Sequence, residues 1–292
     1  MSFPEKLQQL IRADEPLAPL VWLGIGGPAQ YFAEPTSADE LAATFQAALA
    51  DSLAVRILGD GSNVLIREAG FGGLVISLAA AEFSQLDVDE TSLTCGAGAK
   101  LSHAVIKAVG GGLSGLEHLV GIPGTVGGAV VGNASAGGRD IGSVVQALTV
   151  LGDDGQIRTL TQDDAGFGHR TTALGGDVVL SVTFQLEQRD VTDLTKRLQK
   201  LWIARNSLRP TDENRIAMPF VDPDGQPTRD LIQNVGLSGI REGNASLHAH
   251  HPDYLVAHDD ATSGDCLKLI ERVREQVLLQ TGVDLKLNLQ IW

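Results

Sequence analysis

Two glycine-rich segments hold the clearest potential for chemistry in this chain. GDGSN occupies residues 59–63, and GIPGTVGGAVVGNASAGG occupies residues 121–138 with seven glycines in eighteen residues. Glycine permits positive φ and lets another group approach the backbone closely. Successive backbone N–H groups can then form a concave array of donors that holds phosphate oxygens. We therefore predict that the two segments bind a dinucleotide-sized, partly anionic ligand.

The residues expected to contact this ligand are the loop glycines and the small, polar or rigid residues between them. They are Gly59, Gly61, Ser62, Asn63, Gly121, Ile122, Pro123, Gly124, Thr125, Gly127, Gly128, Asn133 and Gly137. Each segment also has a structural interpretation without a ligand. The first can be a tight β-turn, and the second can be a pair of helices packed closely through small residues.

The composition restricts the class of protein. A chain of 292 residues with 43% hydrophobic content is long enough for two or three domains with their own cores. The net charge of -14 argues against a nucleic-acid-binding protein. The two cysteines do not form a disulfide framework, and the N-terminus has no apolar signal-peptide core. No apolar run reaches transmembrane length, so we expect a cytoplasmic protein without a membrane partner.

Three modules must position these loops, with boundaries near residues 75 and 190. The first reads as strand, helix and strand, with a capping-box signature at Ser37 and a buried strand that runs into GDGSN. Strands mixed with helices and hairpins predict an α+β fold. No G-x-G-x-x-G follows the first strand, so a dinucleotide fold of that type is unsupported. The main elements are predicted at 30–35, 41–50, 54–58, 102–112, 144–160, 177–186, 193–210, 251–258, 263–280 and 283–292.

The stretch RIAMPFVDPDG, residues 215–225, is apolar although it lies in a polar part of the chain. It can be a short strand that fills a core. It can also be an active-site segment in which an apolar side chain has replaced a reactive one.

Four stretches resemble the UDP-N-acetylenolpyruvoylglucosamine reductases, flavoenzymes of peptidoglycan precursor synthesis. They are GIGGPAQYFAEPTSADEL (24–41), LGDGSNVLI (58–66), GLSGLEHLVGIPGTVGGAVVGNASAGG (112–138) and FGHR (167–170). The resemblance covers nearly the whole chain. It implies an FAD-binding unit of the vanillyl-alcohol-oxidase type in two parts, 1–75 and 76–190, and a C-terminal α+β substrate domain at 191–292.

The family reaction implies two cofactors, FAD and NADPH, and a UDP-sugar substrate. NADPH reduces the flavin, which then reduces the enolpyruvyl group of UDP-N-acetylglucosamine enolpyruvate. The protein must polarise the substrate carboxylate and deliver a proton to the resulting intermediate. In the family, an Arg in an F-G-x-R motif, a Ser in S-A-G-S-V-F-K-N-P and a Glu on the final strand serve these roles.

The catalytic residues of the family carry over only in part. Arg170 in FGHR matches the family's Arg; its other interpretation is a surface ion pair. Aligning MPFVDP places Met218 at the Ser position, and aligning the final strand places Asn288 at the Glu position. A thioether has no proton to give, and an amide is not an acid or base near neutral pH. In a further family loop His251 stands at the motif histidine and His250 replaces a lysine, and neither is assigned a role.

Three functional hypotheses follow from this pattern. The first is the family reaction, impaired or altered because Met218 and Asn288 replace the acid residues. The second is an FAD-binding homologue with a different redox substrate. The third is a non-catalytic flavin-binding protein. No His or Cys lies within either glycine-rich loop, so we expect no covalent flavin attachment, and we expect no metal.

Overall fold

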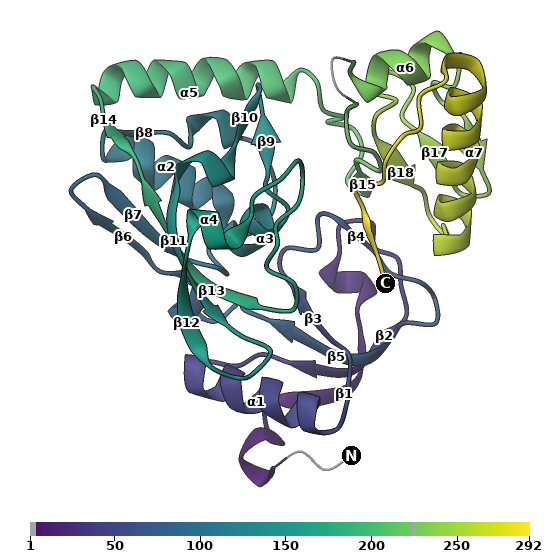
Figure 1. Cartoon of the computed structure of the whole chain (residues 1–292). Helices are drawn as coiled ribbons and strands as arrows, with labels where there is room; N and C mark the ends of the chain where they lie inside the picture. Colours follow the sequence, from purple (N-terminus) through teal and green to yellow (C-terminus); the bar gives the residue numbers. More distant parts are fainter. Residues whose placement is uncertain (1–3, 224–225) are drawn as a thin grey trace. The chain divides into compact units, whose positions relative to one another are not determined.

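The structure is a computed structural model that describes residues 4–223 and 226–292. The chain forms two compact units (Figure 1). Unit 1 comprises Met1–Ala13, Tyr31–Gly59 and Gly73–Ser207, and unit 2 comprises Asp14–Gln30, Asp60–Gly72 and Leu208–Trp292. By their contacts, residues 191–207 belong to unit 1. The functional domains expected at 1–75, 76–190 and 191–292 stay a prediction.

A four-stranded sheet near the N-terminus has the order β1-β2-β5-β3. Its strands are β1 (Ile11–Pro16), β2 (Pro28–Ala33), β5 (Phe71–Ser77) and β3 (Val55–Leu58). The predicted strand at 54–58 is confirmed as β3, although only Leu58 of it is buried. Strand β3 pairs in parallel with β5 and ends at Leu58, directly before GDGSN.

Helix α1 (Ala38–Ala50) follows β2 and begins at its predicted cap. The Ser37 hydroxyl accepts a hydrogen bond from the Glu40 N–H at 3.3 Å. The predicted capping box is only half formed, because the Glu40 carboxylate accepts from the N–H and hydroxyl of Thr36 at 2.7 Å. An acidic side chain in the first turn also interacts favourably with the helix dipole.

A second sheet of unit 1 has the order β12-β11-β13-β7-β6, and all its pairings are antiparallel (Figure 1). The predicted hairpin is confirmed as β11 and β12, and Gly155 in its turn has φ +77°. The strands are β6 (Leu86–Asp89), β7 (Ser92–Gly96), β11 (Val145–Leu151), β12 (Ile157–Thr161) and β13 (Val178–Gln185).

The helices of this part of unit 1 are α2 (Leu101–Gly110), α3 (Val126–Val131), α4 (Gln162–Ala165) and α5 (Val191–Asn206). Helix α5 ends before the predicted stop at Pro210, and of its residues only Leu194 is buried. Two short strand pairs complete the unit. They are β8 (Leu113–Ser114) with β14 (Glu187–Gln188), and β9 (Ser135–Ala136) with β10 (Arg139–Asp140).

Unit 2 is built on a sheet of order β15-β18-β17-β16 with helix α7 (Ser263–Thr281) packed on it (Figure 1). Helix α7 has a complete capping box between Thr262 and Asp265, and it ends at Gly282 with φ 76°. The other elements are β15 (Ile216–Ala217), β16 (Arg241–Glu242), β17 (Ala245–Leu247), β18 (Leu255–Ala257), α6 (Thr228–Asn234), and the parallel pair β4 (Val64–Leu65) and β19 (Gln290–Ile291).

The predicted final strand at 283–292 is interrupted. Regular pairing is confined to β19, and Leu287 makes only an isolated bridge with Phe220. Leu285 and Leu289 are buried as the alternation predicts, but Leu287 is 39% exposed. The interruption arises because this segment bonds first to the 218–221 segment and then to β4, so no single ladder continues.

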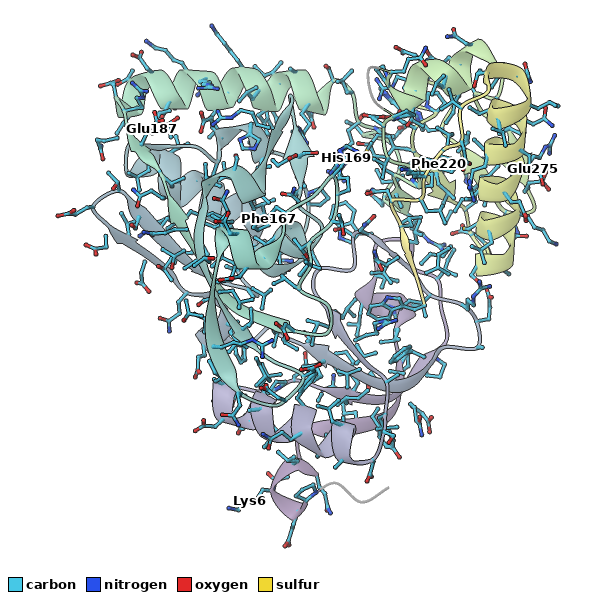
Figure 2. All side chains as sticks on the ribbon, in the orientation of Figure 1. Lys6, Phe167, His169, Glu187, Phe220 and Glu275 are labelled. Carbon is cyan, nitrogen blue, oxygen red and sulfur yellow. The ribbon has the colours of Figure 1, made fainter. Side chains whose placement is uncertain are left out.

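Each unit has its own hydrophobic core. The core of unit 1 contains residues of α1, α2, β7, β11 and β13, and the core of unit 2 contains residues of α6, α7 and the β17–β18 pair. In Figure 2, Phe220 lies within unit 2, whereas Glu275 points outward from α7. Across residues 4–223 and 226–292, no helix combines the length and apolarity that crossing a membrane requires. Short 3₁₀ turns lie at Glu5–Leu7 (η1), Ala18–Leu20 (η2), Ala81–Ser84 (η3), Glu117–Leu119 (η4) and Ile141–Val144 (η5).

Candidate active site

The longer glycine-rich segment runs along the end of β7 and the start of α2. The Val126 N–H donates to the Ala99 carbonyl oxygen at 2.8 Å, and the Gly127 N–H donates to the Ala97 carbonyl oxygen at 2.8 Å. The segment contains one short helix, α3, capped by the Thr125 hydroxyl, which accepts from the Gly128 N–H at 3.3 Å. A pair of packed helices is therefore not what this segment forms.

The two glycine-rich segments meet at Gly59 and Thr125. A Cβ built on Gly59 would lie 2.7 Å from the Thr125 Oγ1, so any other residue would force the Thr125 side chain to move. Gly59 and Gly128 are exposed and Thr125 is half-buried, which leaves backbone of both segments accessible. An accessible strip of bare backbone is what a dinucleotide requires, so these residues fit an FAD.

Several of the other predicted glycines have a reason inside the protein. A Cβ on Gly127 would lie 2.8 Å from the Ala97 Cβ, and one on buried Gly61 would lie 2.3 Å from the Leu20 carbonyl oxygen. Gly121 and Gly124 have φ of +78° and +117°, and Gly137 has φ +59° in the exposed turn between β9 and β10. The number of glycines alone is therefore weaker support for a ligand than the sequence indicated.

Asn133 is buried, and its side chain bonds within unit 1. Its Oδ1 accepts from the Gly142 N–H at 3.1 Å, and its Nδ2 donates to the Gly168 carbonyl oxygen at 2.7 Å. Asn133 thus ties the glycine-rich segment to the FGHR turn. We infer that it supports a cofactor site by holding these two loops.

Arg170 lies at the tip of that turn. Gly168 and Thr171 exchange backbone hydrogen bonds of 2.9 and 3.3 Å, which closes a tight turn around His169 and Arg170. The half-buried Arg170 has φ 57°, an uncommon conformation for a residue other than glycine. Phe167 and His169, which flank Gly168 in the sequence, are labelled in Figure 2. Strained backbone that orients a functional side chain is frequent at active sites.

Sequence reasoning did not select Glu117, which anchors the start of the glycine-rich segment. Its side chain has no exposed surface; it accepts from the Gly115 N–H at 2.7 Å and the Ser114 hydroxyl at 3.1 Å, and it pairs with Arg197 at 3.0 Å. Burial acts to raise the pKa of Glu117, but these hydrogen bonds and the Arg197 charge together hold it below its ordinary value. An acidic residue inside the apolar run GLEHLVGIPG was the available signal.

Met218 and Asn288 lie together in unit 2. The Asn288 Nδ2 donates to the Met218 carbonyl oxygen at 3.1 Å and to the Asn63 Oδ1 at 3.3 Å. Asn63 in turn donates through Nδ2 to the Asn288 carbonyl oxygen at 2.8 Å. Within unit 2, the last residue of GDGSN and the two substituted positions thus form one hydrogen-bonded cluster, beside half-buried Ser62.

The core-filling interpretation of RIAMPFVDPDG describes part of the stretch, and the interpretation as an altered active-site segment stays a prediction. Ile216 and Ala217 form β15 and are buried, and Phe220 is only 3% exposed, so these residues do fill a core. Met218 is half-buried and is not part of that core. Asp224 and Gly225 lie outside the described residues.

The histidine loop is more ordered than a solvated pair. The His248 Nδ1 accepts from the N–H groups of His250 and His251 at 3.2 and 3.0 Å, and its ring stacks on His251 with centroids 5.1 Å apart. Burial lowers the pKa of His251, with nearby Arg229 as the next cause. This stacked, hydrogen-bonded arrangement organises the loop.

Two further features do not involve the individual residues predicted for the site. A cavity of about 980 Å³ in unit 1 is lined by residues of β8, β10, β14 and α5, and none of the predicted site residues lines it. Burial raises the pKa of Cys95 and Cys266 to about 12, so both stay protonated thiols. Among the described residues, no cluster of His, Cys, Asp and Glu could hold a metal ion.

Comparison with known proteins agrees with this arrangement. Residues 29–161 match the FAD binding domain, and residues 209–292 match the C-terminal domain of UDP-N-acetylenolpyruvoylglucosamine reductase. The UDP-N-acetylenolpyruvoylglucosamine reductase of Rhodopirellula baltica is 59% identical over 99% of this chain and 95% of that protein. The enzyme of the same name from Levilactobacillus brevis is 36% identical over 96% of this chain and 92% of that protein.

Comparison with solved structures indicates the same family. The UDP-N-acetylenolpyruvylglucosamine reductase from Thermus caldophilus matches with a TM-score of 0.84 and 32% identity, covering 97% of this chain and 99% of that chain. A solvent-stable cholesterol oxidase matches with a TM-score of 0.51 and 18% identity over 63% of this chain and 39% of that chain, a likeness of fold alone. The predicted α+β fold with an FAD-binding part and a C-terminal domain is confirmed, and the chain belongs to the UDP-N-acetylenolpyruvoylglucosamine reductase family.

Proposed function

We propose that this chain is an FAD-dependent, NADPH-using reductase of the enolpyruvyl group of UDP-N-acetylglucosamine enolpyruvate, with an altered site of proton delivery. Identity of 59% over nearly the whole chain supports the family reaction. The altered site rests on one observation: Met218 and Asn288, 70 residues apart in sequence, are joined by a hydrogen bond of 3.1 Å. Two positions aligned on cooperating family residues are expected to be neighbours.

The cofactor-binding part of the proposal assigns roles to backbone and loop residues. The accessible backbone around Gly59 would donate to the anionic part of FAD, while exposed Gly128 would leave room for the ligand and Thr125 would shape the loop through its cap of α3. When bound, FAD carries hydride from NADPH to the enolpyruvyl double bond. Asn133 and Glu117 would hold the glycine-rich segment in place through their buried hydrogen bonds.

The substrate part of the proposal concerns Arg170, Met218 and Asn288. The Arg170 guanidinium would bind the substrate carboxylate and stabilise the negative charge that develops on it. The Met218 thioether cannot donate a proton, and the Asn288 amide can only hydrogen-bond. Solvent water or another group would then deliver the proton, at a cost of about two to four orders of magnitude in rate.

The proposed substrate is a UDP-sugar, and the proposed location is the cytoplasm, where the family reaction takes place. The net charge of -14 speaks against a nucleic-acid partner. The second candidate function is an FAD enzyme with a different redox substrate. Met218 and Asn288 are uncharged where the family has a Ser and a Glu, so the site favours a less charged substrate than the family's.

Absorption spectra of the purified protein test the proposal. We expect oxidised-flavin bands in the purified protein, their loss when NADPH is added without oxygen, and their slow return when the UDP-enolpyruvyl sugar is added. Absence of flavin would refute the cofactor assignment. Reduced flavin that persists with the sugar but reoxidises quickly in air would refute the family reaction and favour the second candidate.

A pair of variants isolates the role of position 218. Met218→Ser restores a hydroxyl, and we expect flavin reoxidation by the sugar to accelerate by at least about tenfold, the lower part of the range for a general acid. Met218→Leu is the matched control, because it changes shape slightly without adding a proton donor. Equal rates in the two variants would show that position 218 does not deliver the proton.

A further inference from the structure

Asn288 joins two segments of unit 2 that are distant in sequence. On one side, its backbone N–H donates to the Pro219 carbonyl oxygen at 2.8 Å, and its Nδ2 donates to the Met218 carbonyl oxygen at 3.1 Å. On the other side, its Nδ2 also donates to the Asn63 Oδ1, and its carbonyl oxygen accepts from the Asn63 Nδ2 at 2.8 Å. The residue therefore hydrogen-bonds to both neighbouring segments through both its backbone and its side chain.

These contacts fix which way the Asn288 amide points. Its two partners, the Met218 carbonyl oxygen and the Asn63 Oδ1, are both acceptors, so only the NH₂ group of the amide can face them. A flipped amide would bring oxygen against two oxygens. The opposite orientation of Asn63 is excluded too, because its Nδ2 is needed for the Asn288 carbonyl oxygen.

Asn63 is the last residue of the GDGSN loop. Its carbonyl oxygen accepts from the Gln290 N–H at 3.0 Å, so the C-terminal segment holds its backbone as well as its side chain. The 218–221 segment, on the other side of the C-terminal segment, is also held through its backbone. The Val221 N–H donates to the Lys286 carbonyl oxygen at 2.9 Å. Residue 288 therefore connects the loop at residues 60–63 to the 218–221 segment through hydrogen bonds.

We propose that Asn288 is a positioning residue that couples cofactor binding at the loop to the ordering of the 218–221 segment. The inference rests on the proposed function, because it takes FAD as the ligand of the loop. Coupling between two sites is reciprocal: if the ordered segment favours the loop conformation that binds FAD, then FAD must favour the ordered segment. Loss of the coupling hydrogen bonds should weaken FAD binding about five- to tenfold, the effect of one to two net hydrogen bonds.

Asn288→Asp provides a pH-dependent test. The ionised carboxylate has no donor and would face two acceptors, whereas the protonated acid has one O–H that can donate to the Met218 carbonyl oxygen. The two acceptors raise the pKa of the new acid above the ordinary value of about 3.9. FAD should thus bind the variant five- to tenfold more weakly than wild type near neutral pH, and the deficit should shrink as pH falls through that pKa, because one of the two donated hydrogen bonds is restored.

The experiment titrates FAD into cofactor-free protein at a series of pH values and follows flavin fluorescence. Asn288→Ala should bind FAD more weakly at every pH, and Asn214→Asp, an exposed position of the same unit, is the matched control. Thermal midpoints of the cofactor-free proteins separate folding from binding. Wild-type affinity in Asn288→Ala, or a deficit in Asn288→Asp that does not change with pH, would overturn the proposal.

Hydrogen exchange on the wild-type protein tests the coupling without any substitution. FAD should slow exchange of the Val221 and Asn288 N–H groups several-fold, while the Leu247 N–H, which bonds to Ile240 in the same unit, serves as reference. Equal slowing of all three groups, or none, would contradict the coupling. Failure of wild-type protein to bind FAD would instead refute the proposed function, so the two failures are distinguishable.

Discussion

Replacing Glu117 with Gln should destabilise unit 1 strongly, although the two side chains have nearly the same shape. The carboxylate has no exposed surface; it receives hydrogen bonds from the Gly115 N–H and the Ser114 hydroxyl, and it forms an ion pair with Arg197 at 3.0 Å. Gln keeps one acceptor oxygen and turns its NH₂ group toward at least one of these donors. Weaker neutral hydrogen bonds and one unsatisfied buried donor together cost about 2–4 kcal/mol. The Arg197 side chain is 51% exposed, so water can solvate its guanidinium when the ion pair with residue 117 is lost, and this loss adds little to the cost.

Calorimetry at neutral pH measures the effect, and Glu187→Gln is the matched control. Glu187 pairs with Arg189 at 2.6 Å, but its side chain is 70% exposed, so its loss should cost less than about 0.5 kcal/mol. For a protein of this size, about 2–4 kcal/mol lowers the midpoint by roughly 4–16 °C. Equal midpoints for the two variants would refute the role assigned to Glu117.

The stabilisation by Glu117 should also depend on pH in a defined direction. Because its pKa in the folded protein lies below the ordinary value, the contribution is present above the unfolded pKa and is lost as pH falls through the folded pKa. The difference between wild type and Glu117→Gln should therefore shrink in acid. A difference that stays constant from neutral pH into acid would contradict this assignment.

Three further predictions follow from single positions. Gly127→Ala should lower the free energy of unfolding by about 1–3 kcal/mol, because the new Cβ would lie 2.8 Å from the Cβ of Ala97. Gly128→Ala is the control and should cost less in the same urea titration, because the atom nearest to its new Cβ would be 3.4 Å away. Thr262→Ala should cost about 1 kcal/mol by removing the cap of α7, and equal urea midpoints would contradict this. Arg170→Lys should leave the thermal midpoint nearly unchanged and lower the rate of sugar-dependent NADPH oxidation by roughly 10²-fold, and an unchanged rate would remove Arg170 from the site.

Much of the local structure could be predicted from the sequence. Three features were predicted correctly: the cap of α1, the glycine that ends α7 and the turn at Gly155. Each depends only on residues a few positions apart, so the sequence alone shows it. The final segment is different. Its alternation is correct at Leu285 and Leu289, but the strand is interrupted because its partners change along its length, and partners cannot be read from periodicity.

The site shows the same division. The family motifs identified the glycine-rich loops, Arg170, Met218 and Asn288 as the residues of interest. The sequence could not say that Gly127 and Gly61 are required by protein neighbours, or that the side chain of Asn133 bonds within the fold. Both facts depend on which residues, far apart in the sequence, lie within a few ångströms of each other in the folded protein.

The sequence by itself determined the family and the α+β fold, and it predicted the flavin loops. It also fixed that the side chains at positions 218 and 288 have no acidic proton, because residue identity decides which atoms can donate or accept a proton. Only the tertiary structure decided that Asn288 holds Asn63 and Met218 together and that Glu117 is buried beside Arg197. Hydrogen bonds and burial join residues that are far apart in the chain, and folding alone brings those residues within reach of one another.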